Sequence, residues 1–169
     1  MKRLLFIALV LVVVAAAVFA QAKKGQFGTQ VAGTITSTGA SPAGALGARY
    51  MITDNIAVRA MLGFLNNSST TTTGYDLLGA FESHFAGKGG VSPYVGAEIG
   101  YSGQAASGGG PTPSDFGVQA VFGAEYFLSS NFSWGGEASL GFDSATSAVP
   151  ATTTKLSTSV STLLTWYLN

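Results

Sequence analysis

The one histidine of the chain, His84, is the first residue whose type suggests chemistry, and Glu82 lies two positions before it. Nucleophilic or acid–base catalysis needs such groups within hydrogen-bond reach of each other. Ser83 lies between them, so on a strand its hydroxyl points to the opposite face and cannot form a dyad with His84. A histidine beside a carboxylate more often completes a polar network. We therefore expect no catalytic residues and no enzyme activity.

Signals for a cofactor or a metal are also weak. The chain has no cysteine, which excludes disulfides and thiolate zinc sites. The three glycines at 108–110 are not followed by a lysine and open no helix, unlike a phosphate-binding loop. Asp76, Asp115 and Asp143 carry carboxylates that suit Ca²⁺ or the cations that bridge lipopolysaccharide, but they lack EF-hand spacing. A solvated rim explains them better, and we expect no cofactor and no metal site.

The composition restricts the class of protein. The chain has 169 residues, enough for one domain, and 9% of them are charged, against about 25% in ordinary soluble domains. Its mean hydropathy is +0.36, which is typical of a membrane protein. Basic and acidic residues balance at 8 each, so no basic surface is available for nucleic acid.

The N-terminus predicts a cleaved secretory signal peptide. Lys2 and Arg3 precede an apolar run over residues 4–19, which is shorter than the about 20 residues of a comfortable membrane helix. Small residues permit cleavage after Ala20 or after Ala22, and no cysteine follows for lipid attachment. We expect a signal peptide at 1–20, with cleavage after 20 or 22, and a barrel domain at 23–169. An uncleaved membrane anchor is the alternative.

The remainder of the chain alternates between apolar and polar residues in eight segments separated by turn-rich connections. The predicted strands are 26–36, 44–52, 56–65, 74–85, 92–102, 115–128, 132–143 and 154–168. Three connections are short, at 53–55, 86–91 and 129–131, whereas those at 37–43, 66–73, 103–114 and 144–153 are longer and polar. Short periplasmic turns and long extracellular loops are typical of a transmembrane β-barrel.

The parity of each strand position tests this interpretation, because odd-numbered and even-numbered residues of a strand face opposite sides of the sheet. In every predicted strand that contains a charge, the charged residues occupy the face opposite to the large apolar residues, as they must if one face meets lipid, where a charge costs about 2–4 kcal/mol. The aromatic residues lie on the apolar face, except Tyr94, Phe127 and Tyr167, and they gather near both strand ends as two girdles. The pattern predicts an all-β, eight-stranded, antiparallel up-and-down transmembrane barrel. A soluble barrel of lipocalin type would show the reverse pattern.

The polar face predicts a charged layer inside the barrel, nearer its periplasmic end. If Ile52 pairs with Ile56, Arg49 lies directly opposite Arg59, and such like charges repel. Strand order then brings Glu125 across the lumen towards Arg49. Glu137 comes towards Arg59 in the same way, and Glu82 lies beside it along the wall. The members of the layer are Arg49, Arg59, Glu82, His84, Glu98, Glu125 and Glu137.

We expect this layer to plug the lumen, because an eight-stranded barrel is only wide enough to be filled by side chains. A gate that opens a narrow, weakly cation-preferring path is the alternative. Asp76, Asp115 and Asp143 are expected near the extracellular rim, where small residues line the upper lumen.

The chain resembles the small eight-stranded outer-membrane barrels of the OmpA/OmpX-like porin-domain family. The resemblance rests on the signal peptide, the strand–turn–strand at 50–58, residues 124–140 with their Ser-Ser-Asn turn, and the final strand. It covers nearly the whole mature chain. Such barrels often end on an aromatic residue that acts as an assembly signal, whereas this chain ends on Asn169 after Trp166, Tyr167 and Leu168.

The resemblance implies an integral protein of the cell outer membrane in a Gram-negative-type envelope. We expect a mainly structural, monomeric barrel with narrow-pore activity at most. Its expected partners are outer-membrane lipid and lipopolysaccharide, the outer-membrane assembly machinery and periplasmic chaperones, with no nucleic acid. The alternative is surface recognition or adhesion through the long loops. Those loops are rich in Thr, Ser, Gly and Asn and lack the Tyr, Trp and Arg anchors of a tight binding patch.

Overall fold

The computed structural model describes residues 22–36, 43–67, 72–85, 87, 89–105, 114–146 and 152–168. The predicted signal peptide at 1–20 and the middle of each long connection lie outside these residues. Eight strands are present: β1 (Phe27–Thr36), β2 (Ala43–Met51), β3 (Ile56–Asn67), β4 (Thr72–His84), β5 (Val91–Ala105), β6 (Ser114–Phe127), β7 (Phe132–Thr146) and β8 (Thr152–Leu168).

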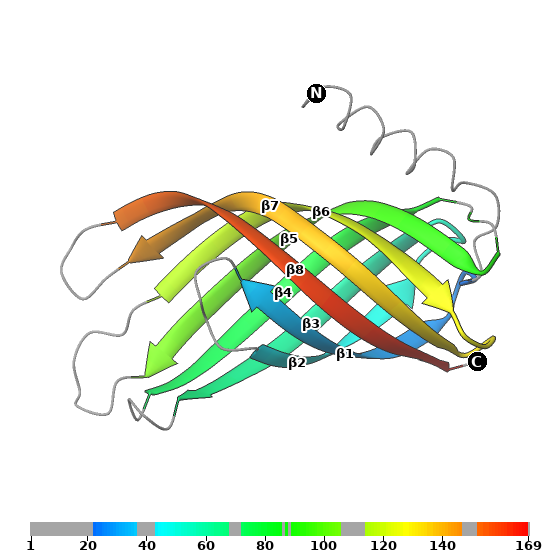
Figure 1. Cartoon of the computed structure of the whole chain (residues 1–169), viewed down its shortest axis with the longest axis horizontal. Coiled ribbons are helices and arrows are strands. Elements are labelled where there is room, and N and C mark those ends of the chain that lie inside the picture. The colour runs from blue at the N-terminus through cyan, green and yellow to red at the C-terminus, as the bar shows by residue number, and fades with distance from the viewer. Residues whose placement is uncertain are drawn as a thin grey trace.

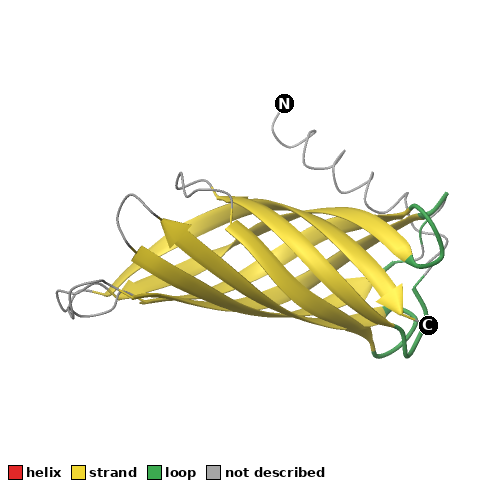
Figure 2. Ribbon diagram, turned by 90° about the horizontal axis from the view of Figure 1, so that it is seen from below, coloured by secondary structure: helices red, strands yellow, loops and turns green. Residues whose placement is uncertain are grey.

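The strands form one closed antiparallel barrel in which each strand pairs with its neighbours in the sequence and β1 also pairs with β8. They run obliquely around an elongated body (Figures 1 and 2), as closure of a sheet requires. The eight-stranded fold predicted from the alternation is therefore confirmed. Among the described residues, no helix is long and apolar enough to span a membrane.

The strands reach further towards the long connections than predicted. Asn67 pairs with Thr72, and Thr146 pairs with Thr152, although both pairs were expected to lie in loops. The physical reason is that backbone pairing does not need an apolar face. The alternation in the sequence fades towards these strand ends while the backbone pairing continues.

The short turns fix the register as expected. Ile52 donates its backbone N–H to the carbonyl of Ile56 at 2.8 Å, and Leu128 donates to Phe132 at 2.9 Å. Arg49 consequently lies opposite Arg59 on the neighbouring strand, which confirms the predicted register of this hairpin.

The two faces of the wall differ as the parity argument required. The outward face is exposed and apolar over its whole circumference. Its large side chains include Phe64, Phe81, Ile99, Phe122, Trp134, Phe142 and Trp166. The charged residues in the middle of the lumen are buried. Tyr94, Phe127 and Tyr167, the three aromatic residues at inward-facing positions, are also buried.

Candidate functional site: the charge layer of the lumen

The charge layer consists of the seven buried residues that the sequence placed inside the barrel. Six strands contribute to it, from β2 to β7 in order around the wall. Because alternate residues of a strand point inward, each strand delivers its charges to the lumen at nearly the same height. The members are Arg49, Arg59, Glu82, His84, Glu98, Glu125 and Glu137, and all are buried.

Arg49 forms ion pairs both with the near wall of the barrel and with the opposite wall. Its Nε lies 2.9 Å from Glu82 Oε2, and its Nη1 lies 3.1 Å from Glu125 Oε1 across the lumen. The guanidinium also stands 5.4 Å from the centre of the Tyr94 ring, a favourable position for a cation beside an aromatic face. Only 1% of the arginine surface is exposed, so these partners replace the water that its charge has lost.

Arg59 contacts three carboxylates. Its Nε lies 3.2 Å from Glu82 Oε1 and its Nη2 lies 3.0 Å from Glu98 Oε2. Its Nη1 lies 2.9 Å from Glu137 Oε2 on the far wall. The contacts from this Nη1 and from the Nε atoms of both arginines are ion pairs without hydrogen-bond geometry. Glu82 thus lies between both guanidiniums and offsets the repulsion between Arg49 and Arg59.

Two tyrosines complete the layer, and the sequence reasoning did not assign them to it. Tyr94 donates its hydroxyl to Glu137 Oε2 at 2.9 Å. Tyr167 donates to Glu125 Oε1, also at 2.9 Å, and Ser133 donates to the same carboxylate oxygen. The available signal was parity, because an aromatic residue on the polar face of a barrel strand must find a partner for its polar tip.

His84 joins the layer to β5. Its Nε2 lies 3.2 Å from Glu82 Oε2, and its Nδ1 lies 3.3 Å from the hydroxyl of Ser92. Ser92, which the sequence did not predict, completes a serine–histidine–glutamate series of contacts. The ring nitrogens are used the opposite way round from a hydrolase triad, in which Nε2 faces the serine and Nδ1 faces the carboxylate. Ser92 is only 1% exposed, and Glu82 already faces two arginines. A substrate would reach this serine only by displacing the network.

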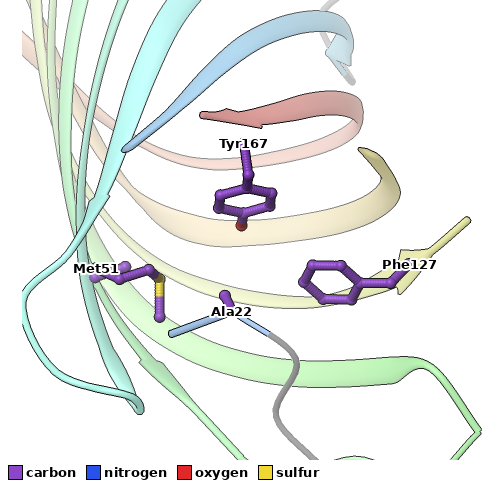
Figure 3. Close-up of a cluster of buried hydrophobic side chains, with 5 residues drawn as sticks. Ala22, Met51, Phe127 and Tyr167 are labelled. Carbon is purple, nitrogen blue, oxygen red and sulfur yellow. The ribbon is translucent and has the colours of Figure 1, made fainter. Parts of the chain in front are cut away.

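Apolar side chains close the layer on both sides. Towards the periplasmic end, the mouth of the barrel holds a cluster drawn in Figure 3, which consists of Ala22, Met51, Ala57, Phe127 and Tyr167. On the other side a second cluster fills the lumen, formed by Ala32, Met61 and Leu163 with Ala45 and Leu78 packed against them. The ion pairs therefore lie between two apolar layers.

The upper lumen, towards the long connections, is less filled. Gln119 donates to Asp143 at 3.5 Å, and Ser139 lies 2.7 Å from the Ser159 hydroxyl. Asp76, Asp115 and Asp143 are all half-buried. Asp115 lies near the start of β6, but β4 begins four residues before Asp76 and β7 continues three residues beyond Asp143.

Asp76 and Asp143 thus lie further from the strand ends than in the predicted strands, because β4 and β7 are longer than predicted. Among the described residues, no three Asp, Glu or His side chains are arranged to hold a metal ion.

The charge balance of the layer is uneven. Four carboxylates face two guanidiniums and one imidazole, so the layer has an excess of acceptors. The hydroxyls of Tyr94, Tyr167 and Ser133 offset part of this excess by donating hydrogen bonds to Glu137 and Glu125. Chemically, the arrangement can hold opposite walls together and exclude solutes.

Comparison with known proteins identifies the architecture. The sequence matches the outer membrane protein beta-barrel domain over residues 6–163. The N-terminal β-barrel domain of Pseudomonas aeruginosa OprF is similar in structure, with a TM-score of 0.56 and 16% identity over 87% of this chain and 100% of that domain.

A structure from a study of de novo designed transmembrane β-barrels gives a TM-score of 0.52 and 15% identity, over 87% of this chain and 98% of the design. At these identities the likeness shows the fold alone. No curated protein matches the sequence.

Proposed function

The chain belongs to the outer membrane protein beta-barrel domain family, and from that premise we propose that it is a structural barrel whose lumen is closed by the charge layer. It is an integral protein of the outer membrane. In the proposal, the barrel adds a rigid, sealed element to the membrane and passes no solute in its resting state. Catalysis is not part of the proposed role.

The observation that carries the proposal is the double cross-lumen linkage. Arg49 meets Glu125 at 3.1 Å and Arg59 meets Glu137 at 2.9 Å, so two ion pairs join opposite walls. Glu82 joins the two arginines to each other. A solute would have to separate these pairs, and leaving a buried charge without its partner costs about 3–5 kcal/mol.

The excess of carboxylates favours cations over anions if the layer opens. Removing a guanidinium leaves several carboxylates facing a widened lumen, and a ring of such groups attracts cations. The proposal therefore includes a prediction for the opened state, a narrow cation-preferring path.

Single-channel conductance of the mature chain in a planar bilayer tests the proposal. We expect no current from the wild-type barrel and a small, cation-preferring current from the double variant Arg49→Ala, Arg59→Ala, because that variant removes both cross-lumen links. Asp143→Ala is the matched control, since it removes one charge from the upper lumen without touching the layer. Heat-shifted mobility on a gel verifies that each protein is folded.

Steady current from the wild-type protein would overturn the closed barrel and indicate a narrow porin. Silence from both the wild type and the double variant would show that something other than the charge layer closes the lumen. Recognition through the long connections, the alternative function, falls largely outside the described residues, and deletion of those connections tests it separately.

A further inference from the structure

The residues just before β1 fold under the periplasmic mouth of the barrel instead of leading away from it. Ala22 is 3% exposed, because its methyl group lies among Met51, Phe127 and Tyr167 (Figure 3). Met51 comes from the end of β2, and Phe127 and Tyr167 come from the ends of β6 and β8. One short segment thus contacts strands from several sides of the barrel.

A tight turn holds this segment in place. Gln26 donates its backbone N–H to the carbonyl of Lys23 at 3.1 Å, and Gly25 has a φ of 86°. That value is the one required at the third position of a type II turn, which favours glycine. Two backbone hydrogen bonds then tie the turn to β2, one from Gly25 to Met51 at 2.8 Å and one from Met51 to Gln26 at 3.0 Å.

A further contact anchors the segment to the first short turn of the barrel. The backbone N–H of Lys24 donates to Asp54 Oδ1 at 2.8 Å. The side chains of Lys23 and Lys24 are exposed, so the segment turns its apolar residue inward and its charges outward. The segment is therefore packed against the barrel, with one face buried and the other face in solvent.

We propose that residues 22–26 are a seal for the periplasmic mouth and that the signal peptide is removed after Ala20, so that Ala22 stays on the mature protein. The inference rests on the closed lumen of the proposed function and adds a second barrier beneath the charge layer, made by other residues. In the cleavage, one water adds across the Ala20–Gln21 peptide bond and leaves a carboxylate on Ala20 and an ammonium on Gln21.

The buried methyl group distinguishes the two cleavage sites that the sequence allows. Cleavage after Ala22 would remove the residue through which the segment enters the mouth cluster. Cleavage after Ala20 removes neither the apolar contact nor any hydrogen bond of the turn.

The intact mass of the protein purified from the outer membrane tests the cleavage site. We expect the mass of residues 21–169, with or without the loss of ammonia that an N-terminal glutamine undergoes. A mass of residues 23–169 would overturn the proposal, because the mature chain would then lack Ala22.

Thiol labelling tests the seal, because the chain has no cysteine of its own. Ala57 is fully buried in the mouth cluster, whereas Asn55, two residues away, is exposed. In detergent we expect a hydrophilic maleimide to label Asn55→Cys rapidly and Ala57→Cys slowly. Adding Ala22→Asp should speed labelling of Ala57→Cys about tenfold or more, since labelling follows the open fraction of the mouth.

Lys23→Asp is the matched control, because it places the same carboxylate one residue away on the exposed side and should leave the labelling of Ala57→Cys unchanged. Equal labelling of Ala57→Cys with and without the Ala22→Asp substitution would overturn the seal. Heat-shifted gel mobility shows whether the Ala22→Asp variant folds. If it does not, Gly25→Ala is used in its place, because alanine strains the turn at this positive φ. Conductance separates the two proposals. The seal predicts that the small current of the arginine double variant grows when Ala22→Asp is added, whereas steady current from the wild-type protein overturns the proposed function whatever the labelling shows.

Discussion

The two halves of the lumen are built by the same strands but are filled differently. The periplasmic half holds both arginines, four glutamates and the two buried tyrosines between apolar clusters. The extracellular half holds short side chains such as Ser139, Ser157 and Ser159, with glycines at Gly63 and Gly117. Side-chain volume and charge are therefore concentrated at one end of the lumen.

The largest effect should come from the charged half. We expect Arg59→Ala to lower the free energy of unfolding by about 3–5 kcal/mol, because it strands Glu82, Glu98 and Glu137 in a buried site. Denaturant titration of the refolded barrel in detergent measures this. A loss below about 1 kcal/mol, the size typical of exposed ion pairs, would mean that the layer is hydrated and that the two halves differ less than their burial suggests.

An intermediate effect should follow from adding one methyl group to the layer. A Cβ on Gly123 would lie 2.3 Å from the Tyr94 ring, and the hydrogen bond to Glu137 holds that ring in place. We expect Gly123→Ala to cost about 1–3 kcal/mol by overpacking. Gly136→Ala is the matched control on the outer face, where a Cβ meets nothing within 4 Å, and there we expect no loss of stability in the same titration.

The smallest effect should come from the extracellular half. Asp143 is half-buried, and the hydrogen bond that it accepts from Gln119 is long at 3.5 Å. We expect Asp143→Asn to change the free energy of unfolding by less than about 0.5 kcal/mol. If unfolding instead shows a loss comparable to that of Arg59→Ala, the upper lumen is a second structural centre and the contrast between the halves does not hold.

The sequence was sufficient to predict the barrel and the face on which its charged residues lie, but not the tyrosines and the serine that contact them. Strict parity made this possible, since a charge such as Arg49 has one face available to it in a membrane strand. The register at Ile52 and Ile56 could be predicted because the turn between them is short. From that register the position of Arg49 opposite Arg59 followed directly.

The contacts of Ser92, Tyr94 and Ala22 depend on loop conformation and side-chain reach, which the alternation of residues along a strand does not determine. The approach of Ser92 to His84 depends on the connection before β5, where Gly89 and Gly90 adopt positive φ angles of 68° and 85°. Which carboxylate meets Tyr94 depends on how far its side chain reaches past β6, over the space left by Gly123. The seal formed by Ala22 was missed because two cleavage sites left its place in the mature chain open.

The pairing of β1 with β8 determines how the chain can fold. Thr29 and Trp166, which are joined by a hydrogen bond in this seam, lie 137 positions apart in the sequence. A ladder with such a separation has a high contact order and forms slowly. The first strand gains its second neighbour only after the last strand has been synthesised, so the chain cannot complete its fold hairpin by hairpin as it emerges. The barrel therefore closes in a late step that brings β8 to β1.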